Sequence, residues 1–190
     1  FRETLFNPER LLRAAPFALL FAVFFGAFSS MKSMIPVVNV YSWDQSLAQL
    51  DATLHAGIHP WRLLQSAFCF PIVTTILNFF YNCWYFLLIF IFFWQTLTRH
   101  LPRVRLQFLL TFFLSWIVIG HILATLFASA GPCYYEAVTG LTQDNPYAEL
   151  MTYLRQANEH STVWALATQE MLWNTYQENR LRIGSGISAM

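Results

Sequence analysis

The chain has 190 residues, of which 56% are hydrophobic, 18% aromatic and only 11% charged, and its formal net charge is +1. Soluble domains carry about 25% charged residues, so the composition excludes an ordinary water-soluble domain. The net charge and the lack of a basic patch exclude nucleic acid as a partner. Three cysteines are an odd number, which argues against a disulfide framework.

Three long uncharged stretches follow Arg13, Arg62 and Arg105. A helix needs about 20 mostly apolar residues to cross a bilayer, and a helix satisfies its own backbone in lipid. We therefore expect spans at about residues 15–34, 70–96 and 106–130. The predicted fold class is all-α, a single polytopic membrane helix bundle with three transmembrane helices and interfacial helices on the outer face.

The first stretch has an alternative interpretation. Arg10 and Arg13, followed by an apolar core and then Ser29 and Ser30, could form a secretory signal peptide. The apolar core continues to Met34, which exceeds the usual length of about 7–15 residues for the apolar region of a signal peptide. A first membrane span therefore fits this stretch better.

Basic residues predict the orientation. The turn between the second and third spans contains Arg99, Arg103 and Arg105 without an acidic residue, and the N-terminal segment is also basic. Positively charged turns stay in the cytoplasm. We therefore expect a cytoplasmic N-terminus and an outer, extracytoplasmic segment at residues 131–183.

The first outer loop contains a helical pattern. Ser42 and Gln45 have the spacing of a capping box, and Gly57 suits the left-handed position after a helix end. Leucines lie on one face, and Asp44 and Asp51 lie on the other. This helix lies on the membrane surface or packs on the bundle; the pattern leaves both alternatives open.

The outer segment should contain two further helices. Asn145 and Pro146 are typical of a helix cap and a first helical residue, and a second helical pattern covers residues 161–179. Residues 184–190 then change to small side chains, directly after Arg180 and Arg182.

Polar groups also occur within the spans. Thr74, Asn78 and Asn82 share one face of the second span, and His121 lies within the third. Hydrogen bonding between helices explains the asparagine face, and packing explains His121 better than a proton or substrate role does. Gly120 begins a stripe of small residues that predicts close helix approach.

Five short segments carry a resemblance to a known family: residues 44–51 (DQSLAQLD), 60–65 (PWRLLQ), 81–84 (YNCW), 131–136 (GPCYYE) and 184–190 (GSGISAM). The chain from about Asp44 onward resembles the type-2 phosphatidic-acid phosphatase superfamily, in its bacterial inositol phosphorylceramide synthase-like, or inositolphosphotransferase, branch. This resemblance implies a protein of the bacterial inner (plasma) membrane. The last two segments are the most specific. The Lys-to-Arg-Pro signature of the superfamily is not recognisable here.

The resemblance implies phosphoryl transfer at the membrane surface. In the family, the small-residue run leads into Pro-Ser-x-His, and a later segment supplies a second His and an Asp. One His forms a phosphoenzyme, the Asp orients it, and the other His protonates the leaving oxygen. This chain ends at Met190, before that motif, so we expect its catalytic residues to lie beyond Met190 and this chain alone to be inactive.

The resemblance also suggests partners and binding residues. It implies a phospholipid or sphingolipid-like substrate, other membrane lipids and the remainder of the same polypeptide as partners, and no metal or cofactor. Water as the acceptor would make a phosphatase, and an alcohol a phosphotransferase. The alternative is a non-catalytic membrane protein, either a transporter subunit or an assembly partner. The candidate substrate-binding residues are Arg182, Ser185, Gly186, Ser188, Tyr134, Tyr135 and Glu136.

Overall fold

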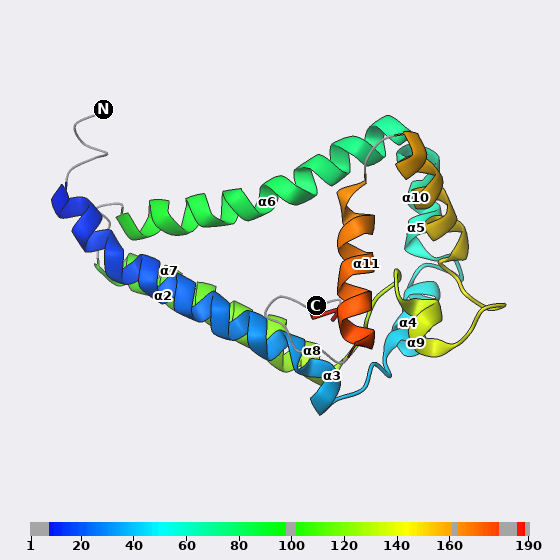
Figure 1. The fold of residues 1–190 in the computed structure, drawn as a ribbon, viewed down its shortest axis with the longest axis horizontal. Coiled ribbons are helices and arrows are strands. Elements are labelled where there is room, and N and C mark those ends of the chain that lie inside the picture. Colours follow the sequence, from blue (N-terminus) through cyan, green and yellow to red (C-terminus); the bar gives the residue numbers. More distant parts are fainter. Residues whose placement is uncertain (1–7, 98–101, 161–162, 179–185, 189–190) are drawn as a thin grey trace.

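Three long helices dominate the computed structural model, which describes residues 8–97, 102–160, 163–178 and 186–188. Every regular element in these ranges is a helix (Figure 1). In chain order they are α2 (Pro8–Ser33), α3 (Ile35–Val38), α4 (Asp44–Leu54), α5 (Pro60–Phe68), α6 (Pro71–Leu97), α7 (Pro102–Ile117), the π-helix η1 (Val118–Leu123), α8 (Ala124–Leu126), α9 (Tyr135–Thr139), α10 (Ala148–His160) and α11 (Trp164–Gln177).

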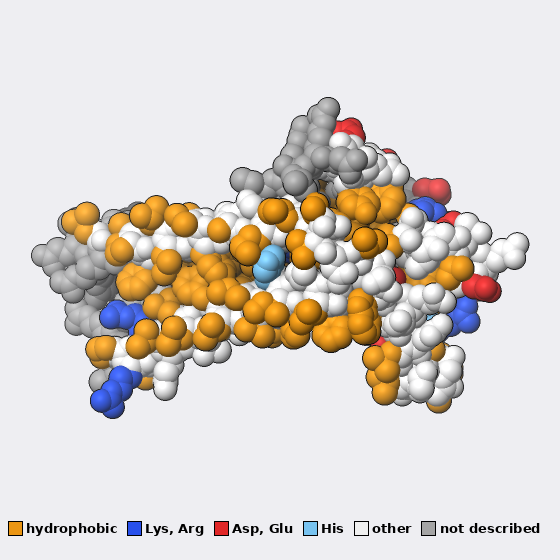
Figure 2. Space-filling model, turned by 90° about the horizontal axis from the view of Figure 1, so that it is seen from below, with side chains coloured by type: hydrophobic (Ala, Val, Ile, Leu, Met, Phe, Trp, Pro, Cys, Tyr) orange, Lys and Arg blue, Asp and Glu red, His pale blue; other side chains and the backbone are white. Residues whose placement is uncertain are grey.

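Helices Ala15–Ser33, Pro71–Leu97 and Pro102–Leu126 are long and apolar enough to cross a membrane. This confirms the predicted all-α membrane bundle, and the chain is an integral membrane protein. Figure 2 shows hydrophobic side chains covering the long-helix part of one face, while the charged side chains lie toward the two ends of the molecule. A bilayer requires this distribution, because charges within its core are costly.

The third helix starts and ends four residues earlier than expected, at Pro102 and Leu126. Its end has a local cause. The backbone N–H groups of Ala130 and Gly131 donate to the Asp44 carboxylate at 3.1 and 2.8 Å. Amides held by a carboxylate cannot also join a helix ladder, so the helix does not continue through Ala130 and Gly131.

Aromatic rings hold the three spans together at one end. Phe92 of α6 is fully buried and lies 4.7 Å from Phe21 of α2 and 5.2 Å from Phe112 of α7, between ring centroids. Phe25 of α2 contacts Trp116 of α7 at 4.9 Å. From this end α6 diverges from the α2/α7 pair toward α5 and α10 (Figure 1), so the bundle is open at the opposite end.

Small residues let α2 approach the third span closely, as predicted. A Cβ on Gly120 would lie 2.8 Å from the ring of Phe28, and Ala124 and Ala128 are fully buried. The contact falls in the π-helix η1, a wider turn that was not expected from the sequence. His121 lies in the same turn, and its buried Nδ1 has no hydrogen-bond partner among the described residues.

Helix α4 corrects two expectations. It begins at Asp44 after Trp43, and no side chain caps it, so the predicted Ser42/Gln45 capping box is wrong. Asp44 is buried rather than facing solvent, because the chain after the third span surrounds it. Gly57 adopts φ +86°, as its place after the helix end predicted.

The exposed face of α4 mixes polar side chains with two leucines. Ala48 packs inward against Tyr135 and Tyr147, whereas Leu50 and Leu54 remain exposed. The packing of Ala48 shows that this helix contacts the rest of the protein, and its two exposed leucines lie away from that contact.

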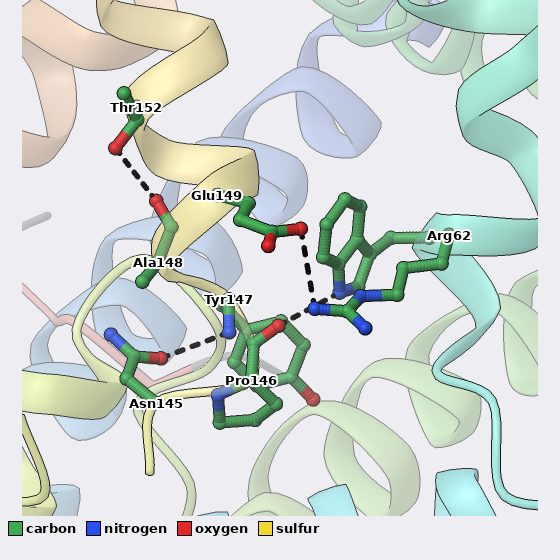
Figure 3. A network of polar contacts seen from close by, with 8 residues as sticks. Arg62, Asn145, Pro146, Tyr147, Ala148, Glu149 and Thr152 are labelled. Atoms are coloured by element: carbon green, nitrogen blue, oxygen red, sulfur yellow. Dashed lines mark hydrogen bonds and ion pairs between the residues drawn. The ribbon is translucent and has the colours of Figure 1, made fainter. Parts of the chain in front are cut away.

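A polar network joins α5 to the start of α10 (Figure 3). Trp61 Nε1 donates to the Pro146 carbonyl at 3.1 Å, and Arg62 pairs with Glu149 at 3.2 Å. Helix α10 begins at Ala148 rather than at Pro146, and the Asn145 side chain caps the preceding turn by accepting from Tyr147 N at 2.9 Å. Helix α11 lies within the range predicted for it.

Candidate functional site

A cavity of about 1160 Å³ lies where α6 has diverged from the other spans. Its walls come from the ends of α2 and α5, the first three turns of α6, α10, α11, residues 130–134 and residues 186–188. The cavity includes the first turns of α6, one of the three helices long enough to cross a membrane. Most of its lining is apolar, with Leu64, Phe68, Leu77, Phe80, Leu150 and Leu166 among the lining residues.

The polar face of α6 forms one wall of the cavity. Hydrogen bonds from this face attach α6 to α10 and α11. Thr74 Oγ1 shares a hydrogen bond of 2.8 Å with the Tyr153 hydroxyl of α10. Asn78 Oδ1 accepts from Ala165 N of α11 at 3.4 Å, and Asn82 Nδ2 donates to the Asn78 carbonyl at 2.6 Å. The predicted bonding between helices is confirmed for Thr74 and Asn78, whereas the Asn82 bond lies within α6; all three side chains also line the cavity.

Asp44 supports the opposite wall from behind. Besides the two backbone amides, its carboxylate accepts from the Ser129 hydroxyl at 2.8 Å. Gly131 follows with φ +85°, a conformation that favours glycine. These bonds fix residues 130–134, which turn into the cavity.

Tyr134 and Cys133 are the ionisable side chains of that wall. Tyr134 stacks on Trp173 of α11 with 5.4 Å between centroids, and its hydroxyl donates to the Gln169 carbonyl at 2.8 Å. Burial raises the pKa of Tyr134 above its ordinary value, and it raises the pKa of Cys133 to about 11. Both groups are therefore neutral at physiological pH, and neither is an activated nucleophile.

Lys32 is the residue that sequence reasoning missed. It lies in the last turn of α2, is half-buried, and is the single charged side chain among the described residues lining the cavity. Residues 186–188 lie against it: a Cβ on Gly186 would be 3.0 Å from the Lys32 carbonyl oxygen and 3.2 Å from its Cγ. Lys32 was the one basic residue between Arg13 and Arg62, which is the signal that could have found it.

Ser188 completes this side of the cavity. The residue is 8% exposed, and its Oγ is buried without a hydrogen-bond partner among the described residues. Behind it, Tyr41 and Ile187 belong to one buried cluster with Tyr134.

The candidate binding residues fall into three groups. Gly186, Ser188 and Tyr134 line the cavity. Tyr135 packs against Ala48 and Tyr147, and Glu136 is exposed and accepts from Asn145 at 3.2 Å, so the structure places these two outside the cavity lining. Arg182 and Ser185 lie outside the described residues.

The described lining has a polar side and an apolar side. It joins one cation, several amides and hydroxyls, and a long apolar wall, and no Asp or Glu is part of it. Such a surface suits an amphiphile with an anionic polar end. No protein-family model, curated protein or solved structure matches this chain.

Proposed function

We propose that this chain is the N-terminal part of a membrane-embedded lipid phosphatase or phosphotransferase, whose cavity receives a phosphorylated lipid headgroup at the outer membrane face. The observation that carries the proposal is the cavity, a mostly apolar space at the outer end of the spans. The side chain of Lys32 supplies its positive charge, and Gly186 and Ser188 also line it. These two residues belong to the small-residue run that, in the family it resembles, precedes the catalytic motif.

The proposed chemistry is phosphoryl transfer through a phosphohistidine, with the histidines and the aspartate in a segment that follows Met190. Water as the acceptor makes the protein a phosphatase, and a lipid or polyol hydroxyl makes it a phosphotransferase. The described residues would bind and orient the phospholipid or sphingolipid-like substrate, and the apolar wall would accept its chains.

The proposal includes an orientation. The N-terminus lies in the cytoplasm of a bacterial cell and the cavity opens on the far side of the inner membrane, as the basic turn between the second and third spans suggests.

The test is a comparison of two polypeptides in detergent or vesicles. The gene is extended beyond Met190 to its stop codon, and both the extended protein and the 190-residue chain are given phosphatidic acid or a radiolabelled phospholipid. The proposal expects binding by both proteins, and phosphate release or headgroup transfer only by the extended one. A stop codon directly after Met190, or an extended protein that lacks histidine and turnover, would sink the enzymatic part.

The second candidate is a non-catalytic transporter subunit or assembly partner. It is motivated by His121, whose buried Nδ1 lies within a membrane helix without a described partner, and by the polar face of α6. Transport of a labelled lipid across vesicles, abolished by His121→Ala and without any chemical conversion, would favour this candidate.

A further inference from the structure

Lys32 sits in a place where its charge has no described counterpart. It lies at the outer end of α2, and no ion pair joins it to another described residue. A lysine there could complement the helix dipole or extend toward water. It instead lines an apolar cavity in which no described side chain carries the opposite charge.

Ser188 provides an independent sign of a ligand in the same place. A buried hydroxyl without a partner destabilises the folded protein, so such groups are uncommon unless something binds them. The Ser188 hydroxyl is buried, lines the cavity and has no partner among the described residues. It is two residues from Gly186, whose backbone lies against Lys32.

We propose that Lys32 and Ser188 form the binding site for the phosphate group of an outer-leaflet lipid, whose acyl chains lie along the first turns of α6. The inference rests on the proposed function, which it deepens by assigning the residues that hold the headgroup. Ammonium and hydroxyl groups both donate to phosphate oxygens, and the absence of a carboxylate in the described lining removes the main source of repulsion.

The cavity favours a lipid over free phosphate as the source of the anion. Leu77 and Phe80 of α6 line it within a helix that spans the membrane, and Leu64 and Phe68 of α5 continue the apolar wall. Inorganic phosphate would contact the polar side alone, whereas a lipid would also bury its chains at about 25 cal/mol for each Å² of apolar surface.

The experiment is native mass spectrometry of the detergent-solubilised full chain with dioleoyl phosphatidic acid or dioleoylglycerol, which share their chains and differ in the phosphate. Wild-type protein should bind phosphatidic acid at least tenfold more tightly than dioleoylglycerol. Lys32→Met should reduce this preference about tenfold, and Lys32→Arg should restore most of it. The matched control is Arg155→Met, which removes an exposed cation of α10 outside the cavity lining and should change nothing.

Ser188→Ala keeps the test decisive if Lys32→Met fails to fold. Removal of the hydroxyl should weaken phosphatidic acid binding about threefold while leaving the unfolding temperature of the lipid-free protein unchanged or higher, because the hydroxyl has no described partner to lose. A lower unfolding temperature with unchanged binding would assign Ser188 to packing and overturn its role.

The remaining outcomes separate the inference from the proposed function. If wild type prefers phosphatidic acid and Lys32→Met does so equally, the Lys32 site is wrong and the proposed function stands. If wild type shows no preference, both are wrong. If millimolar inorganic phosphate displaces phosphatidic acid but not dioleoylglycerol, the anion site is supported; if it binds as tightly as phosphatidic acid does, the lipid source is overturned.

Discussion

Asp44 illustrates how one buried side chain can organise a surface that it does not line. Its carboxylate accepts three hydrogen bonds from residues 129–131, more than 80 positions away in the chain. It thereby ends the third span, joins α4 to it and fixes the cavity wall that contains Cys133 and Tyr134.

Replacement of Asp44 by Ala should destabilise the protein by about 3 kcal/mol or more, since each buried donor left without an acceptor costs about 1–3 kcal/mol. Thermal unfolding of the detergent-solubilised protein measures this loss. Asp51→Ala, on the same helix, removes a carboxylate without a described hydrogen bond and should be nearly neutral. Equal stabilities of the two variants would show that the Asp44 contacts contribute little.

Cys133 should react slowly with alkylating reagents. Its pKa lies near 11, above the ordinary 9.0, chiefly because burial disfavours the thiolate. The thiolate is the reactive form, so the alkylation rate should rise through about pH 11 in the folded protein and through about pH 9 in the denatured chain. The measurement is iodoacetamide labelling of a variant with Cys133 as its single cysteine. If the pH profiles of the folded and the denatured protein coincide, the thiol is not buried.

Among the contacts between elements, that of α2 with η1 depends on Gly120, which has no side chain. The Phe28 ring lies over Gly120 and is held in turn by Trp116 at 5.2 Å between centroids. The ring therefore has little freedom to move away from a larger residue.

Gly120→Ala should cost about 1–3 kcal/mol, because its Cβ would lie 2.8 Å from the Phe28 ring. Gly26→Ala is the matched control: it also lies in a membrane helix, but nothing lies within 4 Å of its added Cβ. Alanine favours a helix over glycine, so the control should be neutral or stabilising. A comparison of the two unfolding temperatures measures the difference, and similar values would mean that α2 can shift to admit the methyl group.

At the scale of the whole molecule, the spans converge at one end and separate at the other (Figure 1). Phe92 and its aromatic neighbours close the first end, while hydrogen bonds from Thr74 and Asn78 attach α6 to α10 and α11 at the second. The cavity results from this divergence, because α6 contacts α10 and α11 where it is separated from the other two spans.

The proposed orientation predicts which side of the membrane each end faces. In a cysteine-free background, Thr152→Cys on α10 should react with an impermeant maleimide added to intact cells. Val104→Cys, near the start of α7, should react only after permeabilisation. Both side chains are exposed, and neither change removes a charge. The reverse labelling pattern would place the cavity on the cytoplasmic side.

The membrane spans could be predicted from the sequence since their length and lack of charge are local properties, and the same holds for Gly57 and α11. The role of Asp44 could not be predicted from the sequence. Helical periodicity assigned it to the solvent face of α4, and nothing near it in the sequence indicates the amides of Ala130 and Gly131. The candidate site was predicted in part: Gly186, Ser188 and Tyr134 line the cavity, whereas Lys32 was not expected there.

That this is an all-helical membrane protein follows from the sequence alone, because hydrophobic length decides whether a helix can cross a bilayer. The sequence also predicted the polar face of α6 and the close approach at Gly120, which follow from helical periodicity. Only the tertiary structure decided where the spans separate and which side chains meet in the opening. Lys32, Asn78, Tyr134 and Ser188 lie on four separate segments, and their proximity depends on packing between parts of the chain that no local pattern relates.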